Sequence, residues 1–156
     1  MNGLPPFQRL LDEHSGDVLA YLVATVGPQE ADDCFQETFI AALRAYPSLT
    51  DGSYLRSWLL TIAHSKAMDH HRARARQPLP VAETPERAAH SPAGHPGSDP
   101  VWGSVAGLPP KQRAAVALRF ACDLPHREIG AALGCSEAAA RRNVHEGIKR
   151  LREEMA

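Results

Sequence analysis

The C-terminal stretch EIGAALGCSEAAARRNVHEGIKRLREEM, residues 128–155, carries basic side chains at the spacing of one helix face. It predicts a short helix, a turn at Gly134 and a longer helix capped by Ser136. A DNA-binding helix-turn-helix needs this order, because glycine tolerates the turn and the exposed face of the second helix enters the major groove. The alternative is an antiparallel helical pair with ordinary solvated charges. The side chains expected to point away from the buried Val144 and Ile148 are Glu137, Arg141, His145 and Lys149, or their neighbours Arg142 and Arg150.

A second basic stretch, YLRSWLLTIAHSKAMDHHRARARQP, covers residues 54–78. Aromatic rings stand beside cations here, an arrangement that binds single-stranded nucleic acid by base stacking and phosphate pairing. Trp58 also shares an apolar helix face with Leu59 and Ile62, so a buried core role for Trp58 is at least as well supported. The five cations, opposed only by Asp69, are Arg56, Lys66, Arg72, Arg74 and Arg76.

A third stretch, EADDCFQETFIAALRAY at residues 30–46, is acidic. Its apolar spacing predicts a helix that packs through Phe35 and Phe39. Composition alone makes this an ordinary solvated acidic helix. The opposite, exposed face is predicted to consist of Asp33, Gln36, Glu37, Ile40 and Arg44.

Charge is sorted along the chain, although the formal net charge is only −1. The net charge is −6 in residues 1–55, +4 in residues 56–76 and +5 in residues 111–152. Near-neutrality is therefore a cancellation between blocks, and basic surfaces remain available to a polyanion.

Metal-dependent or catalytic chemistry finds little support. His64, His70 and His71 invite a metal-binding interpretation, but sequence neighbours diverge on a helix, and no convergent carboxylate and histidine set accompanies them. The cysteines Cys34, Cys122 and Cys135 are odd in number and lack a C-x-x-C pair, so we expect buried apolar roles for them. We expect no cofactor, no metal and no enzymatic activity.

The chain carries neither an apolar run of the roughly 20 residues that span a bilayer nor a basic and then apolar N-terminus. We therefore expect a cytoplasmic protein with no membrane partner.

Apolar residues recur at spacings of three and four through most of the chain, and no segment alternates for long enough to suggest a sheet. Residues 77–107, rich in Pro, Gly, Ala and Ser, predict a flexible linker whose Trp102 and Val105 dock on the C-terminal domain. The expected fold is all-α, with two small helical domains at 1–76 and 108–156. Asp51 or Ser53 is the expected N-cap of the helix that begins near Leu55.

Three stretches together resemble the extracytoplasmic-function sigma factors of bacterial RNA polymerase. They are ADDCFQETFIAALRAYPSL, YLRSWLLTIAHSKAMDHHRARAR and LPPKQRAAVALRFACDLPHREIGAALGCSEAAARRNVHEGIKRLRE, in the family's order and separated by a linker. Their co-occurrence is far more specific than a helix-turn-helix alone.

The resemblance implies a sigma-two-like bundle, a sigma-four-like helix-turn-helix and a division of labour between them. Residues implied to bind core RNA polymerase are Asp32, Asp33, Gln36, Glu37 and Arg44. Residues implied to melt and hold the minus-ten element of promoter DNA are Arg56, Trp58, His64, Ser65 and Lys66, with Arg72 and Arg74 on the backbone. Residues implied to contact the minus-thirty-five element are Ser136, Glu137, Arg141, Arg142 and His145. Lys149, on the same exposed face, is a further expected DNA-binding residue. An anti-sigma factor is a further implied partner.

Several positions depart from the family pattern. Many members have IARN where this chain has IAHS, so Ser65 replaces an asparagine near the flipped base. A Ser or Thr usually caps the first helix of the helix-turn-helix in this family. This chain has Pro125 at that position, and Asp123 is the expected substitute. A stand-alone helix-turn-helix regulator, binding a palindromic site as a dimer, stays open as the alternative.

Overall fold

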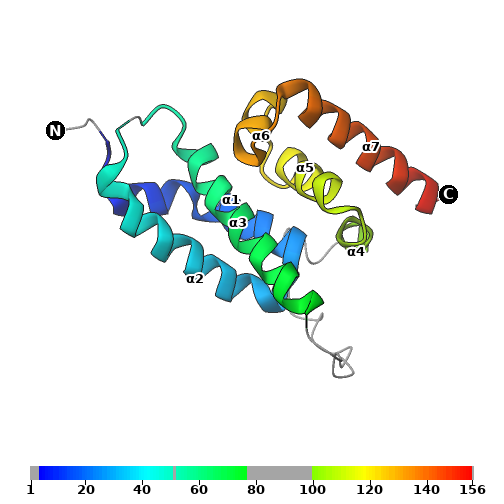
Figure 1. Cartoon of the computed structure of the whole chain (residues 1–156), viewed down its shortest axis with the longest axis horizontal. Coiled ribbons are helices and arrows are strands. Elements are labelled where there is room, and N and C mark those ends of the chain that lie inside the picture. The colour runs from blue at the N-terminus through cyan, green and yellow to red at the C-terminus, as the bar shows by residue number, and fades with distance from the viewer. Residues whose placement is uncertain (1–3, 51, 77–99, 156) are drawn as a thin grey trace.

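The computed structural model describes residues 4–50, 52–76 and 100–155. Within these ranges the chain forms α-helices and one short 3₁₀ helix and no strand, which confirms the predicted all-α fold (Figure 1). Asp51 and residues 77–99 of the predicted linker lie outside the described residues.

The first three helices pack against one another as a bundle: α1 (Phe7–Val26), α2 (Pro28–Ala45) and α3 (Leu55–Ala75). Gly27 separates α1 from α2 with φ of +92°, a value that L side chains rarely adopt. Pro28 then occupies the first position of α2, where a missing N–H leaves no helical hydrogen bond unmade. The 3₁₀ helix η1 (Tyr46–Ser48), which contains Pro47, follows the end of α2.

The predicted cap of α3 is wrong. Tyr54 occupies the N-cap position, with no side-chain cap hydrogen bond, so Ser53 stands one residue too early for that role. Near the start of α3, the Trp58 ring packs against the ring of Tyr46 in η1, with the two ring centroids 6.1 Å apart.

The C-terminal half contains α4 (Pro100–Ala106), α5 (Pro110–Phe120), α6 (His126–Leu133) and α7 (Glu137–Met155). Helix α4 falls within the predicted linker, and it docks as expected on α5 and α7. Its Val105 is buried with Leu108, Val116 and Leu151, and Trp102 packs at the margin of this cluster.

The helix-turn-helix of α6 and α7 forms as predicted. Gly134 ends α6 in the left-handed conformation with φ of +71°. The Ser136 hydroxyl oxygen accepts a hydrogen bond from the Ala139 backbone N–H at 3.0 Å and so caps α7. The predicted cap at Asp123 is wrong, since Pro125 holds the N-cap position of α6 and no side chain bonds there.

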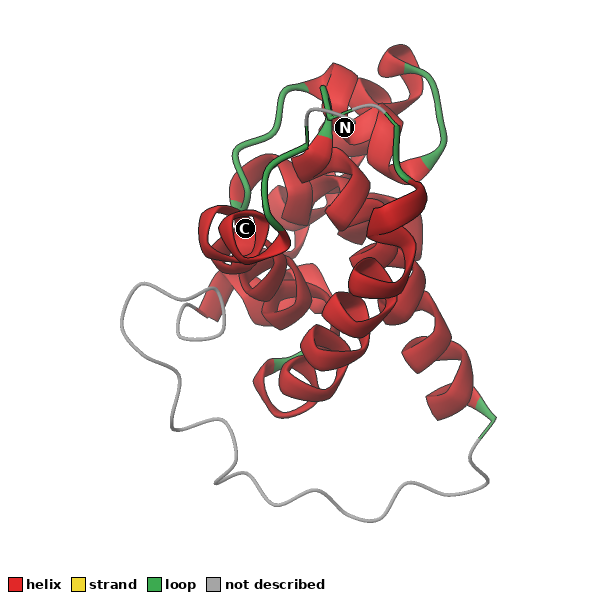
Figure 2. Ribbon diagram, turned by 90° about the vertical axis from the view of Figure 1, so that its left-hand side faces the viewer, coloured by secondary structure: helices red, strands yellow, loops and turns green. Residues whose placement is uncertain are grey.

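The two halves of the described chain touch. Helix α3 contacts α6, and α1 contacts α4 and α5 (Figure 1; Figure 2 gives the view turned by 90°). A single buried cluster runs from the first bundle, through Leu22 and Leu59, into the second, through Leu118 and Ile129. The halves therefore share apolar core rather than only a polar contact.

Helices α5 and α7 approach each other closely at Gly147, where an added Cβ would lie 2.6 Å from Val116 Cγ2 and 3.5 Å from Gln112 Cβ. We expect Gly147→Ala to lower the free energy of unfolding by about 1–3 kcal/mol, because the extra methyl forces the helices apart. Urea denaturation followed by circular dichroism measures it.

Gly16→Ala is the matched control, because Gly16 lies inside α1 with open space around it. It should raise the free energy of unfolding by about 0.5–1 kcal/mol, as an alanine does in an open helix. If Gly147→Ala were stabilising as well, the close approach of α5 and α7 would be disproved.

Candidate nucleic-acid interface

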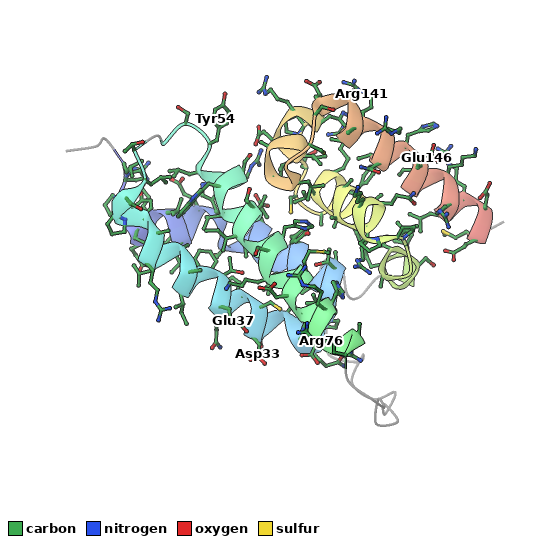
Figure 3. All side chains as sticks on the ribbon, viewed as in Figure 1. Asp33, Glu37, Tyr54, Arg76, Arg141 and Glu146 are labelled. Atoms are coloured by element: carbon green, nitrogen blue, oxygen red, sulfur yellow. The ribbon has the colours of Figure 1, made fainter. Side chains whose placement is uncertain are left out.

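The acidic face of α2 is exposed as a unit. It points away from the rest of the molecule, as Asp33 and Glu37 show in Figure 3. Sequence reasoning missed one member, Leu43, whose side chain is 55% exposed beside Ile40 at 49%. The helical spacing of 36, 40 and 43 was the signal that could have found it. The exposed face is made of Asp32, Asp33, Gln36, Glu37, Ile40, Leu43 and Arg44.

Exposed apolar side chains ringed by charge are typical of protein contact surfaces. The α2 face therefore suits a partner with an apolar and basic surface better than it suits DNA, whose phosphates its carboxylates would repel.

The basic face of α3 is more divided than its sequence suggests. Ser65 and Arg72 are exposed, and Lys66 is half-buried. Trp58 is also half-buried and packs at the margin of the core, which favours its core role. At the N-terminal end of α3 the exposed aromatic residue is Tyr54, which is 57% exposed and lies on the loop that precedes the helix (Figure 3).

Three of the predicted DNA-binding cations of α3 pair with carboxylates. Arg72 pairs with Asp69, the partner visible in the sequence. Arg74 Nη1 lies 3.6 Å from Glu30 Oε1 of α2. Arg56 pairs on two sides, with carboxylates from both halves of the chain. The charges of α3 are therefore partly interleaved with carboxylates brought in from α1, α2 and α6.

Arg56 sits between the two halves. Its Nη1 lies 3.7 Å from Asp17 Oδ2 of α1, and its Nη2 donates a hydrogen bond to Glu128 Oε1 of α6 at 3.2 Å. The Ser57 hydroxyl donates to the same Glu128 oxygen at 3.4 Å. Burial raises the pKa of Asp17 above its usual value, against the attraction of Arg56.

His64 also faces inward rather than toward solvent. Its Nδ1 lies 2.8 Å from the hydroxyl oxygen of Tyr21, which is fully buried in α1. Burial, and secondly the nearby guanidinium of Arg113 on α5, holds the pKa of His64 below its usual value. Farther along α3, burial and then Arg113 and His70 lower the pKa of His71 to about 4.

The outer face of α7 is open. Every predicted residue on it is exposed: Ser136, Glu137, Arg141, Arg142, His145 and Lys149. Glu137 accepts a hydrogen bond from Arg141 at 3.0 Å, a solvent-exposed pair on the first turns of the helix. A shallow groove beside it adds two groups that sequence reasoning missed, His126 at the start of α6 and Arg152 at the end of α7.

A cleft lies beside the contact between α3 and the helix-turn-helix. His64 and Met68 line one wall, and Gly134, Cys135 and Arg142 lie on the other. Two residues predicted to bind different parts of one DNA thus face each other across this cleft. The described part of the chain contains no cluster of three or more His, Cys, Asp and Glu that could hold a metal, and none of its helices could span a membrane.

Both halves of the chain match models of known protein families. The Sigma-70 region 2 family model matches residues 10–77, and the Sigma-70 region 4 model matches residues 100–151. The RNA polymerase sigma factor CarQ of Myxococcus xanthus is 31% identical over 94% of this chain and 87% of its own length. The ECF RNA polymerase sigma factor SigD of Mycobacterium tuberculosis is 35% identical over 88% of this chain and 71% of its own length.

A longer relative, the ECF RNA polymerase sigma factor SigE of Mycolicibacterium smegmatis, is 29% identical over 98% of this chain, which spans 63% of that relative. The sigma factor RpoE of Bartonella quintana, solved with the anti-sigma factor NepR, shares the fold. It superposes with a TM-score of 0.74 at 23% identity and covers 94% of both chains. CnrH, solved with the cytosolic domain of CnrY, gives a TM-score of 0.70 at 20% identity, over 96% of this chain and 86% of that one.

The lowered pKa of His71 has a consequence for stability. Between about pH 6.5 and pH 4 the unfolded chain takes up a proton on His71 that the folded chain resists, so folding weakens as the pH falls through this window. We expect the melting temperature to drop on going from about pH 7 to pH 5. His71→Asn should reduce that drop, measured by circular dichroism at both values.

His145→Asn serves as the control, since His145 is exposed on α7. It should keep the pH response of the unsubstituted chain. An unchanged response in His71→Asn would show that His71 is not the group that titrates.

Proposed function

Because this chain belongs to the extracytoplasmic-function sigma factors of the sigma-70 family, we propose that it directs promoter-specific initiation by a bacterial RNA polymerase. In this role the protein has no reaction of its own to catalyse. It binds the core enzyme and chooses where transcription begins.

One observation carries the proposal: the exposed acidic face of α2 and the exposed basic face of α7 lie on separate helices and point away from each other (Figure 3). A sigma factor must hold an enzyme and a DNA at once, and two separated surfaces of opposite character make that possible. We assign polymerase binding to Asp32, Asp33, Gln36, Glu37 and Arg44, and we add Ile40 and Leu43 as its apolar centre.

The minus-thirty-five element is proposed to meet the start of α7. In the major groove Arg141 and Arg142 can pair with guanine, and Ser136, Glu137 and His145 can reach other base edges or phosphates. Lys149 lies two turns beyond Arg142, where its ammonium group can pair with a phosphate of the DNA backbone. His126 and Arg152 flank the same groove and extend the phosphate-binding side.

The minus-ten element is proposed to meet α3 and the loop before it. Ser65, Lys66, Arg72 and Arg74 offer hydrogen bonds and charge to the backbone of the melted strand. Tyr54, more exposed than Trp58, is the better ring for stacking on an unpaired base. Arg56 and His64 belong to the same proposed surface, although both make contacts within the protein in this structure.

An anti-sigma factor is proposed as the regulatory partner. One solved structure of the same fold, RpoE of Bartonella quintana, was captured with the anti-sigma factor NepR. The alternative of a stand-alone regulator loses its main support, because residues 10–77 match a sigma region rather than a dimerisation or effector domain.

The function is tested by in vitro transcription with core RNA polymerase of the source bacterium. Polymerase alone should fail to start at a cognate promoter, and the added chain should restore initiation. Asp33→Lys with Glu37→Lys should abolish this activity and weaken polymerase binding by at least tenfold, because the reversed charges repel a basic surface. The same variant should leave binding of α7 to DNA unchanged.

A control reversal at Glu154, exposed near the end of α7, alters net charge without touching the α2 face. Glu154→Lys should retain polymerase binding. If the α2 variant bound polymerase as well as the control did, or if the unsubstituted chain failed to redirect initiation, the assignment would be wrong.

Base reading by α7 is tested separately with Arg141→Ala. If Arg141 pairs with a base, the loss should be about 1–3 kcal/mol on the cognate minus-thirty-five element and small on single-base variants of it. Arg150→Ala, on the same helix, should weaken binding to all sequences alike, as a phosphate contact does. Fluorescence anisotropy over a salt series measures both, and a uniform loss for Arg141→Ala would make it a phosphate contact instead.

A further inference from the structure

The cleft beside the contact between α3 and the helix-turn-helix is large enough to hold a small molecule. Its volume is about 380 Å³, within the range of about 300–1,000 Å³ that is typical of ligand pockets. The turn between α6 and α7 leaves the space open, because a Cβ added to Gly134 would meet nothing within 4 Å. The short side chains of Ala114 and Ala139 line two other walls. The remaining lining residues are His64, Met68, Pro110, Lys111, Leu133, Cys135, Arg142 and Asn143.

The lining of the cleft is positively charged. It includes the cations Lys111 of α5 and Arg142 of α7, and it includes no Asp or Glu. Within the described residues no carboxylate pairs with either cation. Pro110 and Lys111 also bring the first turn of α5 to the cleft, where the positive end of the helix dipole adds to the two side-chain charges.

A third cation lies behind one wall of the cleft. Half-buried Arg113 of α5 lines a small neighbouring space that shares His64 and Met68 with the cleft. Its Nη1 donates a hydrogen bond to the backbone oxygen of Ala106 at 3.3 Å, and among the described residues no carboxylate neutralises it. A partly buried charge is screened less by salt than an exposed one, so Arg113 strengthens the preference of the cleft for an anion.

The other walls of the cleft are largely apolar. Met68 of α3, Pro110 of α5 and Leu133 of α6 present carbon atoms to it, and the flexible thioether of a methionine adapts to ligands of irregular shape. A simple inorganic ion would leave this apolar surface in contact with water. The lining therefore suits an organic anion, in which an apolar body carries a carboxylate, sulfonate or phosphate group.

We propose that this cleft is a binding site for a small organic anion whose charged group pairs with Lys111 and Arg142 and whose apolar body packs on Met68 and Leu133. The effect on DNA rests on the function proposed above, because Arg142 is also assigned to the minus-thirty-five element. An anion paired with Arg142 takes a positive charge from the DNA-binding face of α7. Ligand and promoter DNA then weaken each other's binding by the same factor, which makes promoter binding responsive to a small molecule.

Ligand binding is tested on the full chain with a matched pair of fluorescent probes. Anilinonaphthalene sulfonate carries aromatic rings and one negative charge, and phenylnaphthylamine has the same rings without the charge. The sulfonate should bind as one molecule per chain and about tenfold more tightly than the uncharged probe, a difference of the size that charge-assisted contacts supply. Fluorescence titration measures both affinities.

Charge reversal separates the cleft from the net charge of the protein. Lys111→Glu should weaken binding of the sulfonate about tenfold, because the new carboxylate repels it, and should leave the uncharged probe unaffected. Arg127→Glu is the matched control, since Arg127 is exposed on α6 and does not line the cleft. Equal losses in the two variants, at equal helix content by circular dichroism, would overturn the proposal.

Cys135 locates the probe without any substitution. It lines the cleft and is half-buried, whereas Cys34 and Cys122 are buried. With the sulfonate at about ten times its Kd, alkylation of Cys135 by iodoacetamide should slow about tenfold, because only the unoccupied fraction reacts. Mass spectrometry of the labelled peptide measures the rate. An unchanged rate would place the probe elsewhere and contradict the proposal, and so would a chain that binds neither probe, whose cleft takes only water or a larger partner.

The competition with DNA is measured by fluorescence anisotropy on duplex DNA of mixed sequence over a salt series. The bound sulfonate should lower the affinity and reduce the salt slope by about one, as the loss of one phosphate contact does. An unchanged affinity and slope would refute the shared use of Arg142. The probe titrations need neither DNA nor polymerase, so a chain that fails to direct transcription would refute the proposed function and leave the ligand site to be judged on the titrations.

Discussion

The structure depends on α3 being packed from two sides. Leu59, Leu60 and Ala63 are fully buried, and α3 contacts α1 and α2 on one side and α6 on the other. A helix enclosed in this way offers a ligand only one side, at Thr61, Ser65 and Asp69, and its last turn. Its polar residues are consequently distributed between solvent, the acidic groups of neighbouring helices and the opposite half of the chain.

The helices themselves could be read from the sequence. Apolar spacing, Gly27 with Pro28, and Gly134 with Ser136 each act within a few residues, so the pattern holds enough information to place them. The cap positions of α3 and α6 could not be placed as well. At both helix starts the N-cap residue, Tyr54 in α3 and Pro125 in α6, makes no side-chain cap hydrogen bond.

The candidate surfaces were predictable to different degrees for the same reason. The faces of α2 and α7 follow from helical periodicity alone, and all of their predicted residues are exposed. The environment of α3 depends on tertiary contacts with Asp17, Glu30 and Glu128, which no local pattern reveals. A basic stretch in a sequence therefore identifies a surface of positive charge only after the carboxylates packed against it are known.

The close approach at Gly147 has a consequence for how such a protein diverges. Because Gly147 has no side chain, α7 rests directly on the Val116 and Gln112 side chains of α5. A larger residue at either of these α5 positions would push the middle of α7 away from α5. A substitution on α5 can therefore reorient the exposed face of α7 without changing any residue on that face.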